Sequence, residues 1–428
     1  MRKLFGGLWR ETDFMKLWTG RTVSELGSHI TASGLPILAA LLLGASPLEM
    51  GLLASAGAFP VIVVGLFAGV WADRLTRRPI MIAADFGRAV LLLSIPLAYL
   101  IGVLSLAQLL IVAALAGILN IFFEVASQSY LPSLVKPDQL LEGNSKLAAS
   151  LSLAEIGGPP LAGLLIQLLT APLAILFDAL SFLFSAFSLG LIRKPEISPA
   201  RPEAQESIWR EVREGLEVIL KHPFLRVLTF AGMLESFFGG FFHTLYIYYT
   251  LTELGLSPAF IGLTVAAGGA GALLGAFYSE RFAARLGPGL ALVIAAIISS
   301  LFNFGIPLAG GSVFLAMLIL LAIQFCGDIF GQIYRVIQIS LQQQLIPARS
   351  LGKANASIQF LTGSVMPFGL LAGGVLGDLI GAKLTLFIAA LGILLVAFIL
   401  FFSPLRKLRH FPDALTEEAI RLEEALKP

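Results

Sequence analysis

Residues 43–57 read LGASPLEMGLLASAG, and residues 254–268 read LGLSPAFIGLTVAAG. The two stretches lie 211 positions apart and share a leucine–glycine pair, a proline, a glycine–leucine pair and a final alanine–glycine pair. The same shift pairs residues 71–75, WADRL, with residues 282–286, FAARL. A repeat that keeps its order and spacing predicts two similar halves, each of which is one copy of the same structural unit.

The repeat lies in a chain that is too apolar for a water-soluble protein. Hydrophobic residues make up 57% of the sequence and charged residues 13%, whereas soluble domains have roughly 25% charged residues. Uncharged runs such as residues 384–402 have the length of about 20 residues that a helix needs to cross a bilayer. We expect twelve spans, at residues 14–43, 48–72, 78–102, 105–131, 139–169, 172–192, 223–254, 258–285, 288–309, 312–345, 350–380 and 382–403.

These spans predict an all-α membrane protein with twelve transmembrane helices in two six-helix pseudo-symmetric bundles. We expect an N-terminal bundle at residues 1–192, a cytoplasmic linker with an amphipathic helix at residues 193–222, a C-terminal bundle at residues 223–404, and a cytoplasmic tail at residues 405–428. Parallel repeats have a pseudo-two-fold axis along the membrane normal. Such an axis leaves a central cavity between the bundles, which alternating access requires.

Lysine and arginine residues decide the expected orientation. With twelve spans both termini lie on one side, and the loops of the opposite side carry little beyond Lys383. The basic residues of the terminal side are those of the 193–222 linker together with Arg74, Arg77, Arg78, Lys136, Arg281, Arg285, Arg349, Lys353 and Arg406. The positive-inside rule therefore places both termini in the cytoplasm. Residues 1–13 lack a signal-peptide cleavage pattern, so we expect the first helix to remain as a span.

The remaining bulk properties exclude several kinds of partner and cofactor. The net charge of +2, without a concentrated basic stretch, argues against nucleic-acid binding. The one cysteine, Cys326, allows neither an intrachain disulfide nor a thiolate metal site. We therefore expect no metal and no cofactor.

The loop after the second predicted span carries the first informative motif. Residues 69–78 read GVWADRLTRR and resemble the G-x-L-A-D-R-x-G-R-R loop of the major facilitator superfamily, with departures at Trp71 and Thr76. The resemblance implies that this loop latches a cytoplasmic gate in the outward-facing state. The residues that the motif assigns to the latch are Gly69, Asp73, Arg74, Arg77 and Arg78. The alternative is a basic loop that only sets the topology. The repeat copy has Ala284 where Asp73 stands, so any latch is asymmetric.

A second motif lies in the fifth predicted span. Residues 158–163 read GPPLAG and resemble the G-P-x-x-G-G stretch of antiporters in the same superfamily, with Gly158, Pro159 and Gly163 in the matching positions and Ala162 as a departure. A proline removes a helix donor, so the alternative is a kink that serves helix packing alone. Together the motifs resemble the bacterial drug-efflux branch that includes macrolide exporters. This resemblance implies a proton antiporter in the bacterial cytoplasmic membrane.

Charged groups at membrane depth are costly, so they mark candidate sites. The tenth span carries a polar stripe that includes Gln324, Asp328 and Arg335, and the fourth span carries Asn120 and Glu124. The repeat places Glu124 and Arg335 at equivalent points, and we expect them to form a state-dependent ion pair across the cavity. The alternative is two polar residues that find separate partners.

The other candidate proton carriers lie in three further spans. Glu25 lies on one face of the first span with Arg21 and His29, Glu235 lies in the seventh span, and Glu155 precedes the glycine–proline step. Desolvation and nearby cations shift carboxyl groups so that they bind or release protons. The order of preference for the proton carrier is Glu124, Asp328, Glu155, Glu25 and Glu235. We expect His29 to pack or hydrogen-bond rather than bind metal, and we expect Asp178, at the outer end of the sixth span, to be interfacial.

These features favour a secondary active transporter that exports amphipathic drugs or similar small molecules by proton-coupled alternating access. No G-x-x-x-x-G-K-[ST] motif occurs, which argues against ATP as the driving force, and the absence of H-E-x-x-H and G-x-S-x-G argues against an intramembrane enzyme. The expected partners are a small amphipathic substrate, protons and the lipid bilayer, and the expected state is a monomer. The alternatives are an exporter of lipids or lysophospholipids, siderophores or metals, and a membrane receptor without transport.

Overall fold

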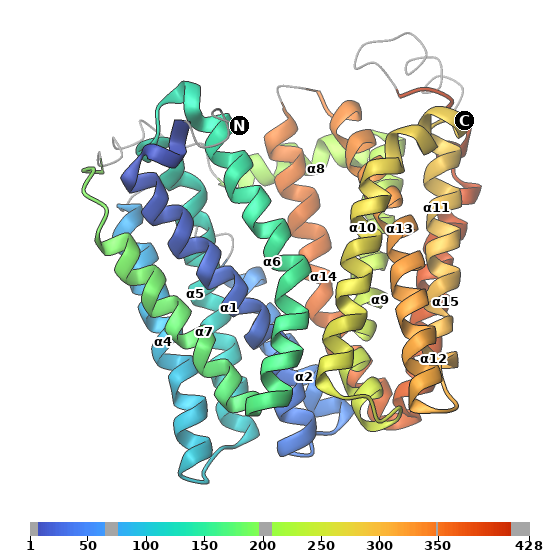
Figure 1. The fold of residues 1–428 in the computed structure, drawn as a ribbon. Helices are drawn as coiled ribbons and strands as arrows, with labels where there is room; N and C mark the ends of the chain where they lie inside the picture. The colour runs from blue at the N-terminus through green and yellow to red at the C-terminus, as the bar shows by residue number, and fades with distance from the viewer. Residues whose placement is uncertain (1–6, 65–75, 197–207, 348–349, 412–428) are drawn as a thin grey trace. The chain divides into compact units, whose positions relative to one another are not determined.

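The computed structural model describes residues 7–64, 76–196, 208–347 and 350–411, and within these residues the chain is helical without strands (Figure 1). The helices are α1 (Thr12–Leu42), α2 (Pro47–Ala58), α4 (Arg77–Leu100), α5 (Leu106–Leu134), α6 (Leu140–Leu169), α7 (Ala171–Gly190), α8 (Ile208–Lys221), α9 (Pro223–Thr252), α10 (Pro258–Leu286), α11 (Pro288–Asn303), α12 (Gly305–Leu308), α13 (Val313–Leu345), α14 (Leu351–Ile380) and α15 (Ala382–Phe402). Short 3-10 helices occupy Gly7–Arg10, Pro137–Gln139 and Pro404–Lys407. Twelve helices of the described chain are long and apolar enough to cross a membrane, as predicted.

The repeated stretches around residues 43 and 254 form the same turn in the structure. Gly44 and Gly255 both have positive φ, 62° and 67°, a conformation that glycine adopts without steric cost. Pro47 and Pro258 then begin α2 and α10, because the first turn of a helix does not need the missing N–H. The conserved spacing of the repeat therefore encodes a helix end, a turn and a helix start.

The chain divides into two compact units, each described by itself below. The N-terminal unit comprises Met1–Glu203 and Ile247–Ala266, and the C-terminal unit comprises Ala204–Tyr246 and Ala267–Pro428. In the N-terminal unit α1 packs on α6 and α7, and α4 packs on α5 and α7 (Figure 1). In the C-terminal unit α11 packs on α13 and α15, and α14 packs on α8 and α15.

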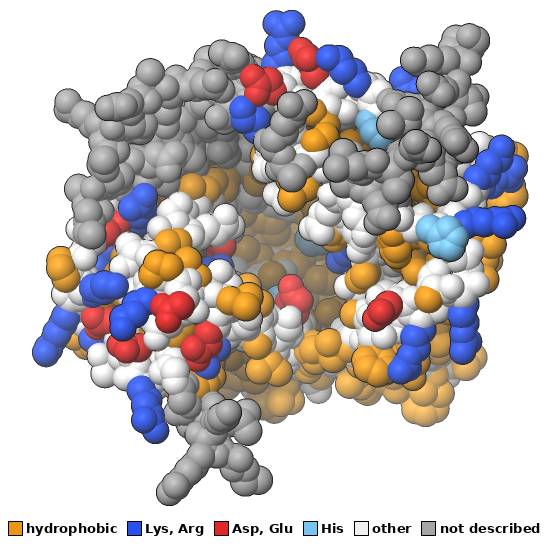
Figure 2. Space-filling view, turned by 90° about the horizontal axis from the view of Figure 1, so that it is seen from above, with side chains coloured by type: hydrophobic (Ala, Val, Ile, Leu, Met, Phe, Trp, Pro, Cys, Tyr) orange, Lys and Arg blue, Asp and Glu red, His pale blue; other side chains and the backbone are white. Residues whose placement is uncertain are grey.

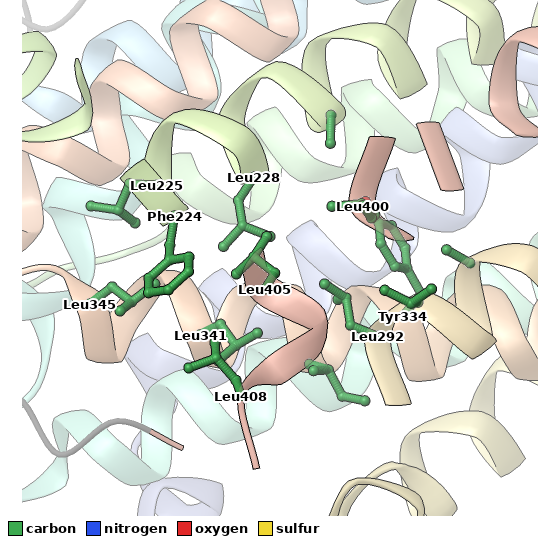
Figure 3. Close-up of a cluster of buried hydrophobic side chains, with 14 of the residues drawn as sticks. Phe224, Leu225, Leu228, Leu292, Tyr334, Leu341, Leu345, Leu400, Leu405 and Leu408 are labelled. Atoms are coloured by element: carbon green, nitrogen blue, oxygen red, sulfur yellow. The ribbon is translucent and has the colours of Figure 1, made fainter. Parts of the chain in front are cut away.

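Each unit has a buried hydrophobic cluster at the same end of its helices. The cluster of the C-terminal unit joins the start of α9, the end of α13 and the chain that follows α15 (Figure 3). Most members of the N-terminal cluster have an equivalent in this cluster, 211 positions further along the chain. The equivalent pairs include Phe14 and Leu225, Leu17 and Leu228, Met81 and Leu292, Tyr130 and Leu341, Leu134 and Leu345, and Leu189 and Leu400.

Helix crossings also repeat at this distance. At the crossing of α1 and α6, a Cβ atom on Gly158 would lie 2.5 Å from Cβ of His29, so only glycine fits. At the crossing of α9 and α14, a Cβ atom on Gly240 would lie 2.7 Å from the backbone nitrogen of Leu370 and 2.8 Å from the carbonyl carbon of Gly369. Gly240 and Gly369 are the repeat equivalents of His29 and Gly158. The crossing is thus repeated, with glycine at one position in both units and with His29 replaced by Gly240 at the other.

Helix α8 lies in the segment for which an amphipathic helix was expected, and it packs on α14 within the C-terminal unit. Lys353 Nζ of α14 lies 2.7 Å from Glu214 Oε2 of α8. Gly215 faces the same place on α14, because a Cβ atom there would meet the backbone oxygen of Lys353 at 2.6 Å. The predicted tail beyond residue 411 lies outside the described residues.

Candidate functional site

Glu124 and Arg21 form an ion pair inside the N-terminal unit. Nη2 of Arg21, on α1, lies 2.8 Å from Oε2 of Glu124, on α5. Nη1 of the same guanidinium donates to Ser127 Oγ at 2.6 Å. The Arg21 side chain is 11% exposed and the Glu124 side chain 36%. Glu124 therefore has a cation partner, and its side chain stays partly exposed.

A second arginine binds the same face of α5 from α4. Arg88 donates through Nη1 to Asn120 Oδ1 at 2.8 Å and through Nη2 to Asp85. Its guanidinium carbon lies 4.5 Å from the ring centre of Phe123 and 4.1 Å from that of Phe182, within cation–π range. Asn120 and Glu124 are four residues apart on α5 and form a polar stripe. Arg21 of α1 binds Glu124, and Arg88 of α4 binds Asn120.

Sequence reasoning missed Asp85 and Arg88, although both are buried, with exposures of 0% and 5%. The available signal was an aspartate and an arginine three residues apart within a predicted span, a spacing that places both on one helix face. Their repeat equivalents in the C-terminal unit are Ala296 and Ser299. This buried pair therefore belongs to the N-terminal unit alone.

Glu25, His29 and Glu155 lie around this cluster. The charges that act on Glu25 are those of Glu124, Arg21, Arg88 and Glu155, and the charge that acts on His29 is that of Glu155. Glu25 and His29 are half-buried and Glu155 is exposed. The structure thus gathers four of the predicted residues and Arg21 into one acidic cluster of the N-terminal unit.

The antiporter motif positions α6 within the same unit. Gly158 packs on His29, as described above. Gly163 faces the first turn of α10, where a Cβ atom would lie 3.1 Å from Cα of Ala259. Ser257, in the turn before α10, donates to Gln167 Oε1 of α6 at 3.1 Å. Pro159 is buried. These positions serve close helix packing in the described structure.

The predicted residues of the C-terminal unit lie along α13 and α9. Asp328 faces Gly268 of α10, and Gln324 lies one turn before it against the same glycine. Arg335 acts electrostatically on Asp328 and on Glu235 of α9, and Tyr334 adjoins Glu235. Glu124 pairs with Arg21 in this structure, and its expected pairing with Arg335 stays a prediction.

The gate motif is only partly described. Gly69, Asp73 and Arg74 lie outside the described residues. The backbone N–H groups of Arg77 and Arg78, at the start of α4, donate to the two carboxylate oxygens of Glu196 at 2.7 and 3.1 Å. A carboxylate at a helix N-terminus satisfies free N–H groups and the helix dipole. Glu196, which follows α7, thereby ties the start of the predicted linker to the gate segment.

The expectation that Asp178 is interfacial is wrong. Its side chain is 1% exposed and lies between α7 and α1, where the hydroxyl of Thr31 donates to it. A position near the end of a predicted span says nothing about which helix covers it. The glycine at position 27, which opens α1 to this carboxyl group, was the available signal.

Figure 2 shows one end of the helices, where Lys and Arg side chains gather on the surface in view. In the described structure, the basic residues at or beside helix ends include Arg77, Arg78, Lys136, Lys353 and Arg406. This distribution is the one on which the expected orientation depends.

Comparisons with known proteins agree with this architecture. The chain is 25% identical over 387 residues to macrolide efflux protein A of Streptococcus pyogenes, covering 86% of this chain and 90% of that protein. It is 26% identical over 389 residues to the multidrug efflux pump Tap of Mycolicibacterium fortuitum, covering 88% and 92%. A bacterial homologue of the iron transporter ferroportin, solved in an inward-facing state, has the same fold with a TM-score of 0.68 and 20% identity, covering 92% of this chain and 99% of that one.

The family model of the Major Facilitator Superfamily matches residues 17–369 and, in a second match, residues 236–427. The matches together extend over nearly the whole chain, both bundles included. A multi-pass membrane protein of this kind transports a small molecule across a lipid bilayer and is not an enzyme. The chain belongs to the Major Facilitator Superfamily.

Proposed function

We propose that this protein is a proton-coupled exporter of amphipathic small molecules that works by alternating access. The observation that carries the proposal is the ion pair between Arg21 and Glu124 within an acidic cluster of the N-terminal unit. Secondary transporters place such groups at the depth where substrate and ion exchange. The protein acts as a monomer in the bacterial cytoplasmic membrane, with both termini in the cytoplasm.

The chemistry of the pair explains how a proton could drive export. When Glu124 is ionised, its charge is balanced by Arg21, which remains bonded to Ser127 as well. When Glu124 takes a proton, Arg21 loses its counter-ion and the cluster gains one positive charge. Because uncompensated charge is costly within a bilayer, the two forms favour different arrangements of the helices or different occupants. A substrate that displaces the proton would couple its own movement to proton entry.

The relatives support the direction and the substrate class. Two of them are named as efflux proteins, for macrolides and for multiple drugs. Macrolides are bulky amphipathic molecules. We therefore propose the same substrate class, an amphipathic drug, for this protein. Glu25, Glu155, Asp328 and Glu235 remain the other proposed proton carriers.

Proton uptake by reconstituted protein tests the proposal. Proteoliposomes loaded with a pH-sensitive dye should show substrate-dependent proton movement when a macrolide is added, and Glu124→Gln should abolish it because the amide cannot ionise. Glu217→Gln is the matched control, since Glu217 lies on α8, where its partners among the described residues are Lys221 and Arg213 at the surface. Transport that ignores the proton gradient and survives Glu124→Gln would contradict proton coupling through this residue.

A further inference from the structure

Asp178 is a buried carboxyl group that the proposed transport cycle does not use. Thr31 of α1 donates its hydroxyl to Oδ2. Ser181, three residues further along α7, has its Oγ 3.1 Å from Oδ1. No nitrogen of Lys, Arg or His in the described chain lies within the ion-pair limit of 4.0 Å from this carboxyl group. The partners of Asp178 are therefore two hydroxyl groups.

If Asp178 is ionised, the single hydroxyl hydrogen of Ser181 is shared between two acceptors, the backbone oxygen and Oδ1 of Asp178. Ser181 has a single hydroxyl hydrogen, and its Oγ lies 2.8 Å from the backbone oxygen of Asp178, closer than to Oδ1. If that hydrogen serves the backbone oxygen, Oδ1 and Oγ face each other as two acceptors. A proton on Oδ1 completes the set: Oδ1–H donates to Ser181 Oγ, Ser181 donates to the backbone, and Thr31 donates to Oδ2.

The charges near Asp178 are an ion pair of opposite signs, so they give the ionised form little net stabilisation. The charged groups that act on Asp178 are Arg88 and Asp85, both of α4. Arg88 is already bonded to Asp85 and Asn120 and stacked on two phenylalanine rings. Helix α1 contributes Thr31 and the backbone at Gly27, and α6 contributes no charged group among the described residues. A bare carboxylate would be costly at such a site.

We propose that Asp178 is a proton-binding site of the N-terminal unit and that its proton holds α1 against α7. A Cβ atom on Gly27 would lie 2.5 Å from Asp178 Oδ1, so the carboxyl group lies directly against α1. Gly27 lies between Glu25 and His29, and loss of the proton would place a charge beneath this part of the acidic cluster. The C-terminal unit has Ala389 and Gly392 at the equivalent positions and carries no such site there.

Infrared spectroscopy of the purified protein tests the proposal directly. A protonated carboxyl group has a C=O stretching band separate from the amide bands. Asp178→Asn should remove such a band from the spectrum at neutral pH, because asparagine keeps the two hydrogen bonds but has no carboxyl group. Asp85→Asn is the matched control and should remove none, since Asp85 is the ionised partner of Arg88. A spectrum unchanged by Asp178→Asn would overturn the proposal.

The pH dependence of thermal unfolding gives a second test that does not depend on transport. A carboxyl group that is protonated when folded and ionised when unfolded lowers stability as pH rises, because the unfolded state binds fewer protons. The melting temperature of the unmodified protein should therefore fall relative to that of Asp178→Asn as the pH rises above about 4, the ordinary pKa of an aspartate in an unfolded chain, and the fall should stop once Asp178 is ionised in the folded protein as well. If the melting temperatures of the unmodified protein and of Asp178→Asn change in parallel with pH, the proposal is overturned. This outcome does not depend on the transport result for Glu124→Gln.

Discussion

Arg88 shows how a single residue fixes the interior of the N-terminal unit. Its guanidinium bonds to Asp85 on its own helix and to Asn120 on α5, and it stacks on Phe123 of α5 and Phe182 of α7. Three helices thus meet at one side chain. Because the planar guanidinium presents several donors in a fixed geometry, lysine could not make the same set of contacts.

Removing one member of this pair should be more damaging than removing both. Arg88→Leu leaves Asp85 buried without its cation, which costs about 3–5 kcal/mol for a pair of this kind. The double variant Asp85→Leu with Arg88→Leu should recover most of that loss, because no buried charge remains. Thermal or denaturant unfolding of the three proteins in detergent measures the difference. A double variant as unstable as the single one would mean that Arg88 acts through its contacts with Asn120 and the rings instead.

At the scale of elements, apolar run length predicted the helices, because a bilayer demands about 20 apolar residues from each span whatever lies beside it. The length of an apolar run does not predict which other helix packs against each face of a span. Asp178 and Arg88 are satisfied by residues of other helices, such as Thr31 and Asn120, and no pattern within their own spans specifies those helices. Glu25 and Glu124 were found because a polar residue repeated on one helix face stands out in an apolar span.

The crossing of α1 and α6 gives a prediction about an element contact. Gly158→Ala should destabilise the protein by about 1–3 kcal/mol, because the new methyl group meets Cβ of His29, which cannot rotate away. Gly157→Ala is the matched control, since a Cβ atom there meets nothing within 4 Å. The control should be neutral or stabilise the helix by up to about 1 kcal/mol.

The repeat supplies a rescue for that variant. The C-terminal unit has glycine at both positions of the equivalent crossing, Gly240 and Gly369. Adding His29→Gly to Gly158→Ala should therefore restore part of the lost melting temperature by removing the atoms that collide. If Gly157→Ala and Gly158→Ala change the melting temperature equally, close packing at this crossing is not what selects glycine.

At the scale of the whole chain, the two units share a scaffold and differ in their charges. Buried core positions coincide after a shift of 211 residues, as Phe14 and Leu225 do, whereas Asp85 corresponds to Ala296 and Asp178 to Ala389. Core positions are fixed by helix packing, which both units need. The charged positions carry no such requirement, so their confinement to one unit favours a functional division between the units.

The orientation of the N-terminal unit in the membrane can be tested across a single helix. Helix α5 has 29 residues and is therefore about 44 Å long, enough to place its two ends on opposite sides of a bilayer. Val103 precedes it and is 61% exposed, and Asp138 follows it and is also exposed.

The only cysteine of the chain, Cys326, is first replaced by serine, Cys326→Ser, so that each newly introduced cysteine is the only one that can be labelled. Because the loop at the Asp138 end carries Lys136 and the loop at the Val103 end carries no lysine or arginine, the positive-inside rule expects the Asp138 end in the cytoplasm. A membrane-impermeant maleimide added to intact cells should label Val103→Cys and leave Asp138→Cys unlabelled until the cells are permeabilised. The reverse pattern would place the termini outside and contradict the orientation on which export depends.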